Sequence, residues 1–206
     1  MEFNEKQVQI ILVAEKLFAD NGFDGTSIRH IAKKAGANIA MISYYFGSKD
    51  KLLEAILLYR ASDFRMELES EIAKNTSYME KLDAIIAFSI KRIHTGRRTH
   101  KIVNLEFSNR YRHIDFNKYI EQKKENLSIL ENFVKAGQEA GVFVKDVNVQ
   151  LLTPTIFGTY FHFYYNKKFY MDILDLKNES DINNYVYDTL TKHIQKTIKA
   201  LLRYED

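Results

Sequence analysis

The stretch that decides the fold is residues 25–53, GTSIRHIAKKAGANIAMISYYFGSKDKLL. Its apolar residues recur every three or four positions over 28–35 and again over 42–46, which predicts two short amphipathic helices. Gly36 stands between them, because glycine adopts the left-handed backbone that ends a helix at little steric cost. A helix, a glycine turn and a second short helix form a helix-turn-helix, whose second helix enters the major groove of DNA.

Polar residues at the predicted helix starts favour the same boundaries. Thr26 is expected to cap the first helix, because its hydroxyl can accept from the unpaired N–H groups of the opening turn. Asn38 is expected to cap the second helix in the same way. Ser48 and Asp50 then open a longer helix, whose dipole is complemented by an acid in its first turn. The recognition helix is therefore predicted at about residues 38–46.

The side chains left on the outside of this stretch suit DNA. Basic residues outnumber acidic ones there, and the resulting positive field attracts phosphates. Hydroxyls can donate to phosphate oxygens, while an amide or an apolar side chain can reach base edges. By expected contact, the predicted set is Tyr44, Tyr45 and Lys49 for phosphates, Arg29 for phosphate or guanine, Asn38, Ile39 and Met41 for bases, and Ser27. On spacing alone, an ordinary helical hairpin with a solvated charged face is the alternative.

The same stretch resembles the signature of the TetR family of bacterial transcription regulators. The matching residues are Thr26, Ile31-Ala32, Ala35-Gly36, Ile42-Ser43-Tyr44-Tyr45-Phe46, Lys49 and Leu52-Leu53. So long a signature argues against the helical hairpin, although it covers only about the first quarter of the chain. Two departures stand out: Ala37-Asn38 replaces the family's frequent Val-Ser, and Ser43 replaces the tyrosine with which many members contact a phosphate.

The resemblance implies a domain organisation. It implies an all-α protein of about nine helices, with a three-helix helix-turn-helix DNA-binding domain in residues 1–47. A larger helical domain for ligand binding and dimerisation would follow in residues 48–206, starting with a connecting helix from residue 48. The implied function is a repressor that binds a palindromic operator in double-stranded DNA as a homodimer and is released by an unknown small-molecule effector.

Composition agrees with an all-α protein of the bacterial cytoplasm. The 206 residues include one proline and few glycines, and apolar residues do not alternate as they do in strands. The absence of cysteine excludes disulfides and thiolate metal sites. The polar N-terminus is unlike a signal peptide, and no uncharged apolar run is long enough to span a membrane.

Helical periodicity continues through the rest of the chain. Capping boxes are predicted at Asn4 with Gln7 and at Ser77 with Glu80, each ahead of an apolar helical pattern. Pro154 should kink its helix or reset the start of that helix, because it lacks an N–H. The other helices are expected at about 48–74, 102–113, 116–140 and 182–201, with a linker through residue 175.

The sequence offers no candidate for catalysis, a metal or a cofactor. None of the six histidines has the spacing of a metal-binding pair, and no nucleophile or phosphate-binding glycine motif occurs. Aromatic residues are expected to line a ligand pocket: Phe88, Phe107, Tyr111, Phe133, Phe157 and Tyr160. The alternative is that the aromatic run 157–165 only packs the core and the dimer interface.

Two other functions stay open at this point. One is an architectural or partner-controlled DNA-binding protein that has no small-molecule effector. The other is a helical enzyme or carrier in which the N-terminal unit is incidental, but it would need a cofactor or turnover that no motif supports.

Overall fold

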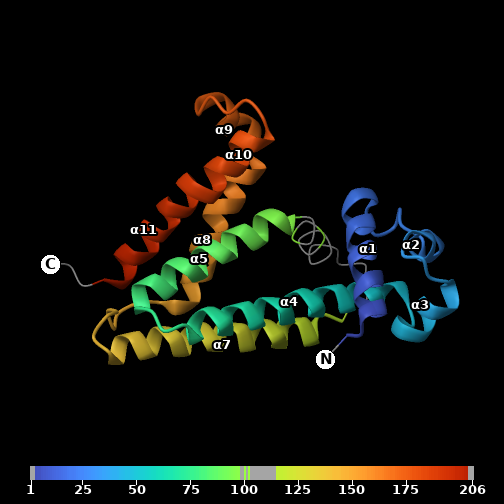
Figure 1. Ribbon diagram of the computed structural model, residues 1–206, viewed down its shortest axis with the longest axis horizontal. Helices are drawn as coiled ribbons and strands as arrows, with labels where there is room; N and C mark the ends of the chain where they lie inside the picture. Colours follow the sequence, from blue (N-terminus) through green and yellow to red (C-terminus); the bar gives the residue numbers. More distant parts are fainter. Residues whose placement is uncertain (1–2, 98–99, 101, 103–114, 204–206) are drawn as a thin grey trace. The chain divides into compact units, whose positions relative to one another are not determined.

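The computed structural model describes residues 3–97, 100, 102 and 115–203, and the regular structure of these residues is entirely helical. Counting the continuous run 179–202 as one helix, the described residues form nine helices, which confirms the all-α prediction (Figure 1). The elements are α1 (Glu5–Asn21), α2 (Ile28–Lys34), α3 (Ile39–Phe46), α4 (Lys49–Ala73), α5 (Tyr78–Thr95), α7 (Asn117–Glu139), α8 (Val149–Tyr165), α9 (Lys167–Ile173), α10 (Glu179–Asn184), the π-helical η1 (Tyr185–Leu190) and α11 (Thr191–Leu202).

The chain divides into two compact units. The first unit comprises Met1–Met66 and Gly96–Asn126, and the second comprises Glu67–Thr95 and Leu127–Asp206. The division falls within α4 and within α7, so each of these two helices contributes residues to both units. None of the described helices is both long enough and apolar enough to cross a membrane.

The first unit packs α1, α2, α3 and the start of α4 around a small apolar core. The predicted capping box of α1 is present, with Asn4 and Gln7 each accepting from the other's backbone N–H. The core side chains include Ile10, Ile11, Ala14, Phe18, Phe23, Ile31, Ile42, Phe46, Leu52, Leu53 and Ile56. Burying such a side chain contributes about 1.5–3 kcal/mol relative to leaving it in water.

One predicted cap is wrong by a single residue. The N-cap of α2 is Ser27, whose side chain accepts from the N–H of His30 at 3.1 Å. Thr26 is fully buried, and its hydroxyl donates to the carbonyls of Leu17 and Gly22 at 3.1 and 2.9 Å. Leu17 lies near the C-terminal end of α1, and Gly22 is the C-cap of that helix. Thr26 therefore closes α1 rather than opening α2.

The second unit packs α5 against α8, η1 and α11. The predicted capping box at the start of α5 is present, since Ser77 and Glu80 accept from each other's backbone N–H. Gly137 of α7 permits a close approach, because a Cβ there would lie 2.2 Å from the ring of Phe143, which is fully buried. The unit's buried apolar residues include Ile86, Ile90, Ile93, Phe133, Val134, Phe143, Ile156, Tyr160, Val186, Ile194 and Ile198.

The later helices differ from the sequence prediction in two places, and of the two outcomes expected at Pro154 one is excluded. Residues 167–173, expected as linker, form α9. The final helix begins at Glu179 and contains η1. The side-chain hydroxyl of Thr191, the residue after η1, donates to the carbonyl of Val186 at 2.7 Å. Pro154 does not reset the start of α8, which begins at Val149 after its N-cap, Asn148. The helix expected at about 102–113 lies almost wholly outside the described residues.

Candidate nucleic-acid interface

The recognition helix predicted at 38–46 is α3, and it has one buried and one exposed face. Asn38 is its N-cap, as expected, and accepts from the N–H of Met41 at 2.7 Å. Ile42 and Phe46 point into the core, whereas Ile39 and Tyr44 are 45% and 85% exposed. Large side chains so exposed on a short helix are available to a partner rather than to the fold.

The turn before α3 is held by a lysine from α1. Lys6 Nζ donates to the carbonyls of Ala35 and Gly36, at 3.3 and 3.1 Å. Gly36 has a φ of +55°, and a cation at this point complements the negative end of the α2 dipole. Lys6 thereby fixes the turn that orients the recognition helix. No local pattern in the sequence marks this contact, because about thirty residues separate its partners.

Lys49, predicted on a phosphate, is bound within the protein. Its Nζ donates to the carbonyls of Phe23 and Thr26 at 3.0 and 3.2 Å, and lies 4.3 Å from the centre of the Phe23 ring. An ammonium has three N–H groups, so one remains for a phosphate. In this structure Lys49 ties the start of α4 to the corner between α1 and α2, and its phosphate contact stays a prediction.

The other predicted DNA-binding residues occupy the surface of α2 and α3. Ser27 and Arg29 are exposed at the start of α2, and the Ser27 hydroxyl can still donate outward while it accepts as the cap. Met41 and Tyr45 are half-buried, and the Tyr45 ring lies 5.4 Å from that of Tyr44, centre to centre. The structure thus places the predicted set on the helix-turn-helix, with Lys49 and Tyr45 partly committed to packing.

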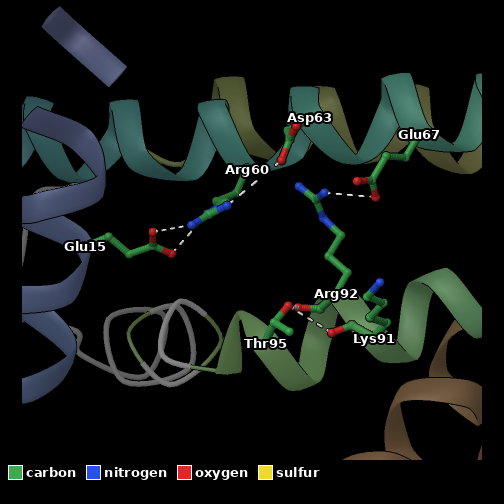
Figure 2. Close-up of polar contacts among 7 residues, drawn as sticks. All are labelled: Glu15, Arg60, Asp63, Glu67, Lys91, Arg92 and Thr95. Carbon is green, nitrogen blue, oxygen red and sulfur yellow. Dashed lines mark hydrogen bonds and ion pairs between the residues drawn. The ribbon is translucent and has the colours of Figure 1, made fainter. Parts of the chain in front are cut away.

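An ion pair between a buried glutamate and a half-buried arginine joins α1 to α4 within the first unit (Figure 2). Arg60 Nε and Nη2 donate to the two carboxylate oxygens of Glu15, at 3.1 and 2.5 Å. Glu15 is only 6% exposed. Burial opposes the charge of Arg60, but the hydrogen bonds and charge of Glu15 outweigh it and raise the arginine's pKa. In the sequence, Glu15 falls on the same apolar helix face as Ile11, Ala14 and Phe18. A carboxylate buried on such a face needs a charged partner, so this position was the signal for one.

Polar contacts also hold the second unit. Arg92 of α5 donates to Glu67 of α4 at 3.1 Å, and Thr95 donates to the carbonyls of Lys91 and Arg92 within its own helix (Figure 2). These contacts do not involve the predicted pocket residues.

Tyr160, predicted to line a pocket, belongs to a buried polar network. It is fully buried, and its hydroxyl lies 2.9 Å from His94 Nδ1. The other ring nitrogen of His94 lies 2.7 Å from Asn183 Oδ1. The rings of Tyr164 and Tyr187 also pack against His94 edge to face. The sequence did not single out His94, because nothing local marks a histidine as buried.

Three of the other predicted pocket residues lie within the described residues: Phe88 of α5, Phe133 of α7 and Phe157 of α8. The ring of Phe133 packs against Tyr78 and Phe143, at 5.8 Å from each. Phe88 and Phe157 are half-buried. Phe107 and Tyr111 lie outside the described residues. The pocket therefore stays a prediction, and among the described residues no group of three or more His, Asp or Glu could hold a metal ion.

Two family models match the chain. The model described as bacterial regulatory proteins, tetR family, matches residues 10–56, which include the helix-turn-helix. The model described as YsiA-like protein, C-terminal region, matches residues 59–179. Together they span both the recognition helix and most of the remaining chain.

Known proteins of similar sequence are bacterial regulators. The chain is 26% identical to the fatty acid metabolism regulator protein of Bacillus subtilis over 155 residues, which cover 75% of this chain and 79% of that protein. It is 27% identical to the transcriptional repressor NicS of Pseudomonas putida, over 67% of this chain and 66% of that one.

Solved structures share the fold. The fatty acid degradation regulator FadR from Bacillus halodurans superposes with a TM-score of 0.75 at 23% identity, covering both chains completely. The regulator FadR from Bacillus subtilis, in complex with stearoyl-CoA, superposes with a TM-score of 0.66 at 24% identity, covering 89% of this chain and 97% of that one.

Proposed function

The chain belongs to the TetR family of bacterial regulatory proteins, and on that premise we propose that it is a repressor released from its operator by a long-chain acyl-CoA. Like these relatives, it is a transcription regulator and not an enzyme. Residues 1–47 would form the DNA-binding domain, and residues 48–206 the domain for effector binding and dimerisation. The protein would act in the cytoplasm.

The exposed face of α3 carries the DNA-binding part of the proposal. Tyr44, at 85% exposure, presents a hydroxyl to phosphate oxygens, and Ile39 presents an apolar surface suited to a thymine methyl. Asn38 Oδ1 is used as the helix cap, which leaves its Nδ2 group to donate to a base acceptor. Arg29 would add a phosphate or guanine contact from α2.

Dimerisation would place two recognition helices on two half-sites. Cyclic two-fold symmetry implies a palindromic operator, with half-sites about 34–36 Å apart or a multiple of that spacing. Exposed apolar side chains on the later helices support such an interface: Leu151, Tyr165, Phe169, Ile173, Tyr187 and Leu201.

The effector class rests on the named relatives. One relative is a fatty acid metabolism regulator, and one structure of the same fold holds stearoyl-CoA. The proposed effector domain, residues 48–206, holds many aliphatic and aromatic side chains, which suit contact with an acyl chain.

The DNA-binding proposal is tested by fluorescence anisotropy on fragments that flank the protein's own gene. We expect fragment-selective binding that weakens at least about ten-fold in Tyr44→Ala, a loss of about 1.4 kcal/mol. Lys124→Ala is the control, because it removes an exposed charge of α7 outside the helix-turn-helix and should leave affinity unchanged. Equal, salt-sensitive binding to every fragment would instead indicate an architectural protein.

A further inference from the structure

Asn126 is a buried side chain with one unpaired hydrogen-bond acceptor. It lies on α7 and is 9% exposed, and its Nδ2 donates to the carbonyl of Ala61 on α4 at 3.1 Å. Its Oδ1 is buried and has no hydrogen-bond donor among the described residues. The orientation of the amide is fixed, because a backbone carbonyl can only accept and Nδ2 must face it.

The part of α4 that Asn126 contacts is buried and apolar. Ala61, whose carbonyl it binds, and Leu57, one turn earlier, are both buried. Tyr119 lies seven residues before Asn126 and so on the same face of α7, and burial raises the pKa of its hydroxyl. A leucine would fill the same volume without leaving an unpaired acceptor, whose burial costs free energy. With no donor for it among the described residues, an acceptor kept in such a place points to a donor supplied by a bound molecule.

We propose that Asn126 Oδ1 accepts a hydrogen bond from an N–H or O–H group of the effector. The ligand would therefore combine a hydrogen-bond donor with an apolar segment. An acyl-CoA has this composition, since its pantetheine arm carries amide N–H groups and joins an acyl chain. This inference rests on the proposed function and assigns to one residue the recognition of the ligand's polar part.

The position of Asn126 connects ligand binding with DNA binding. Its amide holds α4, the helix that begins at Lys49, three residues after the recognition helix ends at Phe46. A ligand bound at Oδ1 adds a contact that depends on the arrangement of α4 and α7. The ligand can shift the regulator between a DNA-binding and a DNA-released state only if this contact differs in strength between the two states.

Binding of two probes to Asn126→Leu tests the proposal. Stearoyl-CoA offers amide donors, whereas stearate at pH 7.5 is a carboxylate with an equal acyl chain and no donor. We expect the variant to bind stearoyl-CoA about ten-fold more weakly by calorimetry and to bind stearate as the wild type does. Its melting temperature without ligand should be equal or higher, because the unpaired acceptor is gone.

Asn117→Leu is the matched control, because it makes the same change at an exposed position of the same helix, α7. This variant should bind both probes as the wild type does. If Asn126→Leu does not fold, Asn126→Ala supports the same comparison.

The outcomes separate this inference from the proposed function. Wild-type binding of stearoyl-CoA that is unchanged in Asn126→Leu would overturn the role of Asn126 and leave the acyl-CoA proposal standing; a buried water would then satisfy the acceptor. A wild type that binds its operator but not stearoyl-CoA would overturn the acyl-CoA proposal together with this inference. An equal loss for both probes would show a packing role and would also overturn it.

Discussion

Polar side chains are used in different ways around the helix-turn-helix and in the second unit. Next to the helix-turn-helix, Lys6 of α1, Thr26 and Lys49 of α4 each donate to two backbone carbonyls. In the second unit, His94 instead pairs with the side chains of Tyr160 and Asn183. The first arrangement fixes the path of the backbone, and so the orientation of the recognition helix. The second fixes how α5, α8 and α10 pack against one another.

The hydrogen-bond network assigns the protons of His94. Because Asn183 Oδ1 accepts, the neutral ring carries its hydrogen on Nε2. Nδ1 then accepts from the Tyr160 hydroxyl. This assignment follows from the partners and not from an observed proton.

Replacing Phe46 should give the largest effect, because it breaks the core that the helix-turn-helix shares with α4. Phe46→Ala should lower the free energy of unfolding by about 3–5 kcal/mol and abolish DNA binding. Ile39→Ala is the control on the exposed face of the same helix, and it should weaken DNA binding with little change in stability. Urea unfolding and anisotropy measure the two quantities. Unchanged stability in Phe46→Ala would contradict the core role.

Replacing Tyr160 should have an intermediate effect that is confined to stability. Tyr160→Phe removes the hydroxyl that donates to His94 Nδ1, and leaving a buried acceptor short of its donor costs about 1–3 kcal/mol. The folded variant should still bind DNA, because the helix-turn-helix is untouched. Tyr165→Phe, at a 59% exposed position, should stay within about 0.5 kcal/mol of the wild type in the same urea titration. Equal stability of both variants would contradict a stabilising role for the hydrogen bond between Tyr160 and His94.

Replacing Glu80 should give the smallest effect, and one that depends on pH. Hydrogen bonds from the side chain and then the backbone of Ser77 hold the pKa of Glu80 below its ordinary value. The carboxylate therefore stabilises the fold above the ordinary pKa, and this contribution is lost as pH falls through the lower folded value. Melting temperatures of the wild type and Glu80→Gln should differ slightly at pH 7 and converge in acid. A difference that grows in acid would contradict this sign.

The features that sequence predicted are those set by neighbouring residues. The caps at Asn38 and Ser77, the glycine turn at Gly36 and the long helix from residue 48 each depend on a few consecutive positions. Thr26 shows the limit of this reasoning. A hydroxyl next to a helix start can serve either neighbouring helix, and the bend after α1 decides which one it serves.

The features that sequence missed join residues far apart in the chain. Glu15 and Arg60 are 45 residues apart, and His94 and Tyr160 are 66 apart. Such pairs form only when packed helices bring them together, and periodicity shows which face of a helix is buried but not what it faces. The candidate site was predictable as a set of positions on α2 and α3. The engagement of Lys49 with two carbonyls was not.

Release of operator DNA by stearoyl-CoA is the most direct test of this regulator. A labelled operator bound to the wild-type protein is titrated with stearoyl-CoA while anisotropy is followed and calorimetry records ligand binding. We expect anisotropy to fall to that of free DNA over the same concentration range in which the ligand binds. Ligand binding to saturation with the DNA still fully bound would contradict an acyl-CoA-responsive repressor.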